Sequence, residues 1–202
     1  MRIIRVEHGG TSYYGILEDG LVFRLHQQPG HMEPIPLSEA KVLPLVTPSK
    51  VVCVGLNYKA HAEELGYPLP NMPSFFLKPP SSIIGNGEPI VLPSGMGRIE
   101  HEAELAMVVG KVCRNLTPEE AEESLFGFTC ANDVTAREVQ KVDPLIGHCK
   151  SYDTFCPIGP WIETELEDIN DLSIRCLVNG EVRQSANTGD MIFRPLDLLC
   201  FL

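Results

Sequence analysis

The chain has 202 residues, 44% hydrophobic and 21% charged, which allows one domain of ordinary size with a small appendage and excludes wholesale disorder. Its formal net charge is -11 without any lysine or arginine run, which argues against nucleic acid and anionic membrane surfaces as partners. No apolar stretch is long enough to span a membrane, and residues 1–10 contain no signal-peptide core.

The seven cysteines are scattered and form no Cys-x-x-Cys pair. Cys53, Cys130 and Cys176 fall in strand-like apolar runs. We therefore expect reduced core thiols of a cytoplasmic protein, rather than zinc ligands or disulfides.

The first part of the chain predicts a small N-terminal β domain. Residues 13–17 and 21–25 are β-like runs on either side of Glu18-Asp19-Gly20, which is a hairpin signal. Residues 27–48 are rich in proline, which blocks both helix interiors and central strands. We therefore expect an irregular connection there and a boundary near Ser49, giving an N-terminal domain of residues 1–48 and a second domain of residues 49–202.

A buried strand and a short helix are predicted directly after this boundary. Residues 50–55 form an apolar run, and residues 59–65 follow as the helix. His61 and Glu64 are three residues apart on that helix and share a face. A histidine with an orienting carboxylate can act as a general base, but the same pair can be a surface ion pair, and the spacing leaves both open.

The acidic stretch from Ile99 to Val109 predicts one continuous β-strand. Side chains alternate along a strand, so Glu100, Glu102 and Glu104 share a face. Three carboxylates on one face repel one another unless a cation lies among them, and a hard divalent cation suits oxygen ligands. The alternative is a solvated edge strand, and this stretch alone does not decide between the two.

Local signals predict the next helix and a later hairpin. Thr117 is a predicted N-cap, Pro118 suits the first helical position, and Glu120 completes a capping box for a helix that runs to about Leu125. Asn179-Gly180 joins two strand-like runs and is a strong hairpin signal.

Between these two signals lie the polar residues that complete a candidate site. Residues 127–133 predict a strand with Asp133 at its end. A short helix follows, on which Arg137 and Gln140 share a face, and residues 147–153 predict a polar loop.

From about Lys50 onward the motifs, taken together, resemble those of the fumarylacetoacetate hydrolase superfamily. They are, in order, Val54-Gly55-Leu56-Asn57-Tyr58 with His61 and Glu64; Phe75-Phe76-Leu77-Lys78-Pro79; His101-Glu102-Ala103-Glu104-Leu105; Asn132-Asp133-Val134-Thr135-Ala136-Arg137 with Gln140; and Lys150-Ser151-Tyr152-Asp153 before Cys156-Pro157. The resemblance implies an α+β, mostly β fold. It is a mixed β-sandwich or roll with short helices, preceded by the small N-terminal β domain of many bacterial members.

The resemblance also implies a metal site and a set of catalytic residues. The cation would be Mg²⁺ or Mn²⁺, with Ca²⁺ as a further candidate. The implied metal ligands are Glu102, Glu104 and Asp133; the implied catalytic residues are His61, Glu64 and Lys150; and the implied substrate-binding residues are Lys78, Arg137 and Gln140.

The implied substrate is a small 2-oxo acid, and the implied chemistry is C–C bond cleavage through a metal-stabilised enolate. This covers an acylpyruvate or fumarylpyruvate hydrolase and an oxaloacetate decarboxylase. Two alternatives stay open: an isomerase of the 2-hydroxyhepta-2,4-diene-1,7-dioate type in aromatic catabolism, and a metal-binding paralogue without catalysis. By resemblance we also expect a cytoplasmic homodimer. Family members continue beyond the equivalent of Leu202, so we expect the sheet to lack strands and the site to lack one wall.

Overall fold

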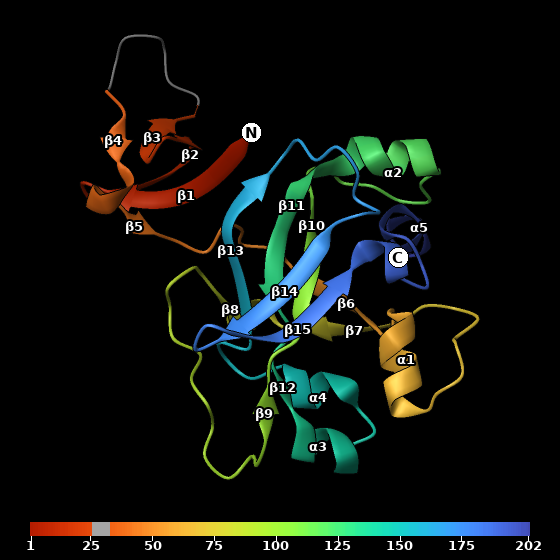
Figure 1. Ribbon diagram of the computed structural model, residues 1–202. Helices are drawn as coiled ribbons and strands as arrows, with labels where there is room; N and C mark the ends of the chain where they lie inside the picture. The colour runs from red at the N-terminus through yellow and green to blue at the C-terminus, as the bar shows by residue number, and fades with distance from the viewer. Residues whose placement is uncertain (26–32) are drawn as a thin grey trace.

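The computed structural model describes residues 1–25 and 33–202, and it is mostly β with five short α-helices (Figure 1). The strands are β1 (Arg2–His8), β2 (Thr11–Glu18), β3 (Leu21–Arg24), β4 (Ile35–Pro36), β5 (Lys41–Val42), β6 (Val51–Gly55), β7 (Ser74–Lys78), β8 (Ile83–Ile84), β9 (Ile99–Glu100), β10 (Ala103–Val109), β11 (Leu125–Asn132), β12 (Thr135–Ala136), β13 (Cys156–Glu163), β14 (Ser173–Val178) and β15 (Glu181–Asn187). The α-helices are α1 (Lys59–Leu65), α2 (Pro118–Ser124), α3 (Arg137–Val142), α4 (Ile146–Lys150) and α5 (Pro195–Phe201).

A nine-stranded sheet forms the body of the molecule, with the main path β10-β11-β13-β1-β2-β3-β4. β5 pairs with β1, and β8 pairs with β13. In the described part of the chain every strand pair is antiparallel except β8 with β13. The pairing of β1 with β13 joins the first segment to the rest of the sheet, and Ile3, Ile4, Ile158 and Ile162 pack in one core beneath it. The domain boundary near Ser49 stays a prediction.

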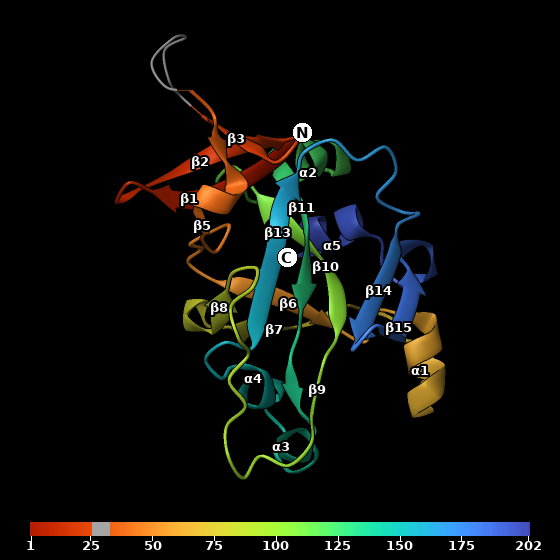
Figure 2. The same cartoon turned by 60° about the vertical axis from the view of Figure 1, so that its left-hand side comes forward.

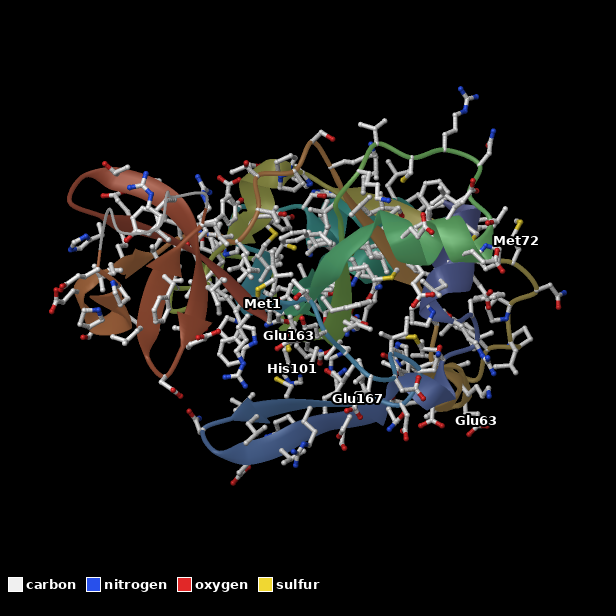
Figure 3. The ribbon with its side chains drawn as sticks, turned by 90° about the horizontal axis from the view of Figure 1, so that it is seen from above. Met1, Glu63, Met72, His101, Glu163 and Glu167 are labelled. Atoms are coloured by element: carbon white, nitrogen blue, oxygen red, sulfur yellow. The ribbon has the colours of Figure 1, made fainter. Side chains whose placement is uncertain are left out.

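Three two-stranded pairs surround this sheet: β6 with β7, β9 with β12, and β14 with β15. Turned by 60°, the molecule shows the β14–β15 hairpin standing beside β10, the last strand of the large sheet (Figure 2). Seen from above, the same hairpin forms a separate layer (Figure 3).

Elements with strong local signals form where the sequence predicts them. Helix α1 has the predicted bounds. The capping box of α2 is present, with the Thr117 hydroxyl accepting from the Glu120 N–H and the Glu120 carboxylate accepting from the Thr117 N–H. Both hairpin turns are present, and Asn179 and Gly180 have φ values of 54° and 83°, as a tight hairpin turn requires.

Two site-bearing segments differ from the prediction. The strand predicted from Ile99 to Val109 is wrong as one element, because the chain leaves β9 after Glu100 and joins a different sheet at Ala103. The predicted polar loop of residues 147–153 is largely helix α4, which ends at Lys150. Helix α4 forms because the side chains of Cys149 and Lys150 are buried. Gly147 is a poor helix former, and it makes this segment resemble a loop in the sequence.

Three further expectations need correction. The predicted irregular connection contains β4 and β5 within residues 33–48, because those strands find partners in the sheet; residues 27–32 lie outside the described residues. Strand β6 is only partly buried, since it belongs to a two-stranded ribbon. All seven cysteines are free thiols, as predicted, but Cys130 is exposed because it lies on the outward face of β11.

A second, smaller core lies below the large sheet and supports the polar residues described next. It contains Val134, Ala136, Cys149 and Phe155, all buried. Val134 is adjacent in sequence to Asp133, Ala136 to Arg137, and Cys149 to Lys150. Packing in this core therefore holds the end of β11 close to the end of α4. Within the described residues, no helix is both long and apolar enough to cross a membrane.

Candidate active site

The ends of four elements meet at one cluster of charged side chains. Asp133 directly follows β11, and Glu102 directly precedes β10. Their main chains are joined, since the Asp133 N–H donates to the Glu102 carbonyl at 2.8 Å. Lys78 is the last residue of β7, and Lys150 is the last residue of α4. Strand ends and short helices thus bring together residues that are far apart in the sequence.

Lys150 is the centre of this cluster. Its ammonium Nζ lies 2.6 Å from Glu102 Oε2, 2.7 Å from Asp133 Oδ2 and 2.7 Å from the Thr135 hydroxyl. An ammonium has three N–H donors, so these three acceptors satisfy it. Burial alone would lower the pKa of Lys150, but Asp133 and Glu102 outweigh burial and raise it. Lys150 is therefore a fixed positive charge.

Lys78 holds the other side of Asp133. The Lys78 side chain is fully buried, and its ammonium donates to Asp133 Oδ1 and to the Val134 carbonyl. The two oxygens of Asp133 therefore each accept from a different lysine. The resemblance implies that Lys78 binds the substrate; in this structure its ammonium contacts Asp133 and the Val134 carbonyl.

Arg137 and Gln140 share a face, as predicted. The Arg137 guanidinium donates to Glu100 at 2.6 Å, lies 2.6 Å from Glu102 Oε1, and donates to Gln140 at 3.0 Å. The hydrogen bond from Arg137 lowers the pKa of Glu100. Glu100, which the resemblance leaves outside the metal ligands, thus has a role in orienting Arg137.

Glu104 is the remaining predicted metal ligand. Burial, together with the neighbouring charges of Glu102 and Asp133, raises its pKa to about 8, whereas Lys150 acts in the opposite direction. The carboxylates of Glu102, Glu104 and Asp133 are thus close enough for each negative charge to disfavour ionisation of the others. A further cation among them would reduce this repulsion.

The donor chemistry of these residues fits a hard divalent cation, since Glu102, Glu104 and Asp133 offer only oxygen. However, among residues 1–25 and 33–202 no three histidine, cysteine or carboxylate side chains are grouped so as to hold a metal ion. Lys150 lies between Glu102 and Asp133 instead. An ionised carboxylate has about four acceptor sites, so both can still accept a further contact.

The predicted dyad forms away from this cluster. His61 Nδ1 lies 3.2 Å from Glu64 Oε2, and the two side chains are 44% and 75% exposed. Helix α1, which carries them, lies at the edge of the molecule in both Figure 1 and Figure 2. Within the described residues neither side chain has a hydrogen bond or ion pair to the cluster.

Two residues near the cluster were not predicted. Thr135 accepts from Lys150 and donates to the Asp133 carbonyl, and its place two residues after Asp133 was the available signal. The Tyr58 hydroxyl is buried and has no hydrogen-bond partner in the described part of the chain. Burial raises the pKa of Tyr58, and Glu104 contributes to the same shift, so Tyr58 lies near the acidic group.

Comparison with known proteins places this geometry in a family. Residues 50–202 match the family described as "Fumarylacetoacetate (FAA) hydrolase C-terminal", and residues 1–44 match the one described as "Rv2993c-like, N-terminal". The human mitochondrial protein named oxaloacetate tautomerase FAHD2A is 42% identical over 175 residues, which are 83% of this chain and 55% of that protein. The matched region covers 55% to 67% of the curated relatives compared, including proteins from Archaeoglobus fulgidus and Mycobacterium tuberculosis.

Solved structures agree in fold over nearly the whole chain. The 5-carboxymethyl-2-hydroxymuconate delta-isomerase from Mycobacterium smegmatis is 38% identical, with a TM-score of 0.89 over 99% of this chain and 80% of that one. The maleylpyruvate hydrolase from Sphingobium sp. SYK-6, in complex with manganese(II) ion and pyruvate, is 29% identical, with a TM-score of 0.80 over 99% and 81%. The sequence match over residues 50–202 and the shared fold agree, and the chain belongs to the fumarylacetoacetate hydrolase family.

Proposed function

We propose that this chain is a divalent-metal-dependent enzyme that forms the enolate of a small 2-oxo dicarboxylic acid, and that it interconverts the keto and enol forms of an oxaloacetate-type substrate. The observation that carries this proposal is the buried Lys150 ammonium, fixed by Glu102 and Asp133 beside the further acid Glu104. An enolate oxygen is stabilised by positive charge that is already in place before the reaction.

The charge balance of the site supports an acidic substrate. The groups that meet there are the acids Glu100, Glu102, Glu104 and Asp133 and the bases Lys78, Arg98, Arg137 and Lys150. When all are ionised, the four acids and four bases balance, and a bound dication would make the site positive overall. A protein of net charge -11 would thereby attract a dicarboxylate locally.

Glu102, Glu104 and Asp133 would hold the cation, for which Mg²⁺ or Mn²⁺ is the proposed identity. When bound, it would supply Lewis-acid stabilisation of the enolate. Lys150 would add a second positive charge there, and Arg137 would hold Glu102 in place through its ion pair. The complex of the Sphingobium hydrolase with manganese(II) ion and pyruvate, which is a 2-oxo acid, supports this choice by analogy.

Tautomerisation is favoured over hydrolysis because enolate chemistry at the cluster needs no attacking water. The mitochondrial relative at 42% identity is named a tautomerase, whereas the Sphingobium hydrolase is 29% identical. The M. smegmatis neighbour supports a related proton-transfer activity, isomerisation.

C–C bond hydrolysis is the second candidate, and one observation favours it. His61 and Glu64 are within hydrogen-bond distance, as a base and its orienting carboxylate must be. Hydrolysis is ranked second because the side chains of His61 and Glu64 are exposed and do not contact the charged cluster.

The test is a turnover assay with enol oxaloacetate, followed by the ultraviolet absorbance of the enol, with and without Mg²⁺ or Mn²⁺. We expect metal-dependent acceleration that Lys150→Met removes and that Lys141→Met, an exposed lysine paired with Glu138, leaves intact. Acylpyruvates run in parallel report hydrolysis. Cleavage of acylpyruvates without acceleration of tautomerisation would overturn the first proposal in favour of the second.

A further inference from the structure

Gln184 makes an unusual contact with the main chain of the proposed site. Ala103 is the first residue of β10 and lies between Glu102 and Glu104. The Gln184 Oε1 accepts from the Ala103 N–H at 2.7 Å, and the Gln184 Nε2 donates to the Ala103 carbonyl at 2.9 Å. The side chain therefore pairs with this residue as a neighbouring strand would.

This contact provides hydrogen-bond partners for main-chain groups at the edge of the large sheet. β10 is the last strand of the large sheet, so the groups at Ala103 that point away from β11 have no strand to pair with. Buried main-chain N–H and carbonyl groups need partners. A side chain that satisfies both must carry a donor and an acceptor together, which a primary amide does.

Gln184 belongs to the β14–β15 hairpin, which is a sheet separate from the one that contains β10. It lies on β15 opposite Cys176 of β14, on the partly buried face of the hairpin. Figure 2 shows this hairpin beside β10, and contacts between β10 and β14 confirm the proximity. From the other side, Asn132 Oδ1 accepts from the Glu102 N–H at 3.0 Å. The side-chain amides of Asn132 and Gln184 thus hold the main chain at Glu102 and Ala103, where the chain passes from one sheet to the other.

We propose that Gln184 is a positioning residue for the cation site: by fixing the main chain at Ala103, it sets the directions in which Glu102 and Glu104 present their carboxylates. This inference rests on the proposed function, because it assumes that those two glutamates bind the cation. Residues that orient metal ligands from behind change metal affinity without touching the metal.

The test compares two variants of Gln184 with two controls on the same hairpin. Gln184→Met keeps the approximate shape and removes both hydrogen bonds, and Gln184→Glu removes the donor. Arg183→Met changes an outward-facing neighbour that contacts Glu181, and Cys176→Ala removes packing from the inner face without breaking the amide contact. The Mn²⁺ dissociation constant is measured by the electron paramagnetic resonance signal of free Mn²⁺, and thermal unfolding is measured on each variant.

We expect both Gln184 variants to bind Mn²⁺ roughly 10- to 100-fold more weakly. The Arg183 and Cys176 variants should bind as the parent does, even if Cys176→Ala melts earlier. Affinity that instead follows the melting temperature across all four variants would overturn the proposal, because Gln184 would then act only on stability.

Amide hydrogen exchange without metal separates this inference from the proposed function. Gln184→Met should accelerate exchange of the Ala103 N–H by about 5- to 10-fold, and leave that of Ala106, whose N–H faces β11 within the β10–β11 ladder, unchanged. Unchanged exchange at Ala103 overturns the inference. If exchange rises but neither Glu102→Ala nor Gln184→Met weakens Mn²⁺ binding, the cation site is wrong and the positioning role falls with it.

Discussion

Replacing Lys78 by methionine would show how much of the cluster's stability depends on its buried charges. The Lys78 side chain is 0% exposed and the Asp133 side chain 12%, so both partners are shielded from water. Removing one partner of a buried ion pair destabilises a protein by about 3–5 kcal/mol, because the remaining charge is left uncompensated. Asp133 keeps Lys150 at 2.7 Å, so we expect the low end of that range, about 3 kcal/mol.

The measurement is urea unfolding at neutral pH, with Lys141→Met as the matched control. Lys141 is 60% exposed, so its loss should change the free energy of unfolding by less than about 0.5 kcal/mol. The double variant Lys78→Met with Asp133→Asn should lose less than the sum of the single variants, since the neutral amide no longer needs the lysine. A loss below about 1 kcal/mol for Lys78→Met would refute this account of the cluster.

Three further predictions concern α2, the dyad and the chain's first residue. Thr117→Ala should lower the free energy of unfolding by about 1 kcal/mol, because the capping box is lost; an unchanged urea midpoint would contradict this. His61→Ala should leave Mn²⁺ affinity unchanged, measured by paramagnetic resonance, and should lower any C–C hydrolysis by roughly 10²- to 10⁴-fold. Burial alone would raise the pKa of Glu163, but the hydrogen bond that it accepts from the Met1 ammonium lowers it overall; Figure 3 labels both residues, which lie next to each other. Glu163→Gln should therefore lower stability by about 0.2–1 kcal/mol above the ordinary glutamate pKa, and the deficit should disappear as pH falls through the lowered pKa; a pH-independent difference in urea midpoints would contradict this.

Local signals predicted the elements that depend on neighbouring residues. The helix with His61, the capped helix that begins after Thr117 and the hairpin at Asn179-Gly180 all form as expected. In each case the turn, cap or alternation lies within a few residues, so the sequence contains the whole cause.

Long-range contacts explain what local patterns missed. The alternation rule placed Glu100, Glu102 and Glu104 on one strand face, but the chain changes sheets between the first and the third. That change depends on β11 and β12, which follow tens of residues later. Helix α4 has no side-chain cap and is too short to be stable alone, so it depends on packing against the second core.

The sequence identified which charged residues belong to the cluster, but not which of them pair with one another. The resemblance named the residues of the cluster, but their pairing depends on where β7, β11 and α4 end relative to one another. Lys150 meets Glu102 across 48 residues of sequence and Lys78 meets Asp133 across 55. No local pattern contains such distances.

The two lysines that contact Asp133 also have a consequence for the proposed cation site. Buried carboxylates without a cation are costly, and Lys78 and Lys150 compensate Asp133 through one oxygen each. Glu104 has no such partner among the described residues, and burial together with the neighbouring carboxylates raises its pKa. The bases therefore pair with the other acids of the cluster and leave the Glu104 carboxyl group as an uncompensated remainder. That remainder, centred on Glu104, is where a dication would gain the most. The same lysines that allow the cluster to fold would then make the occupied site positive enough for an anionic substrate.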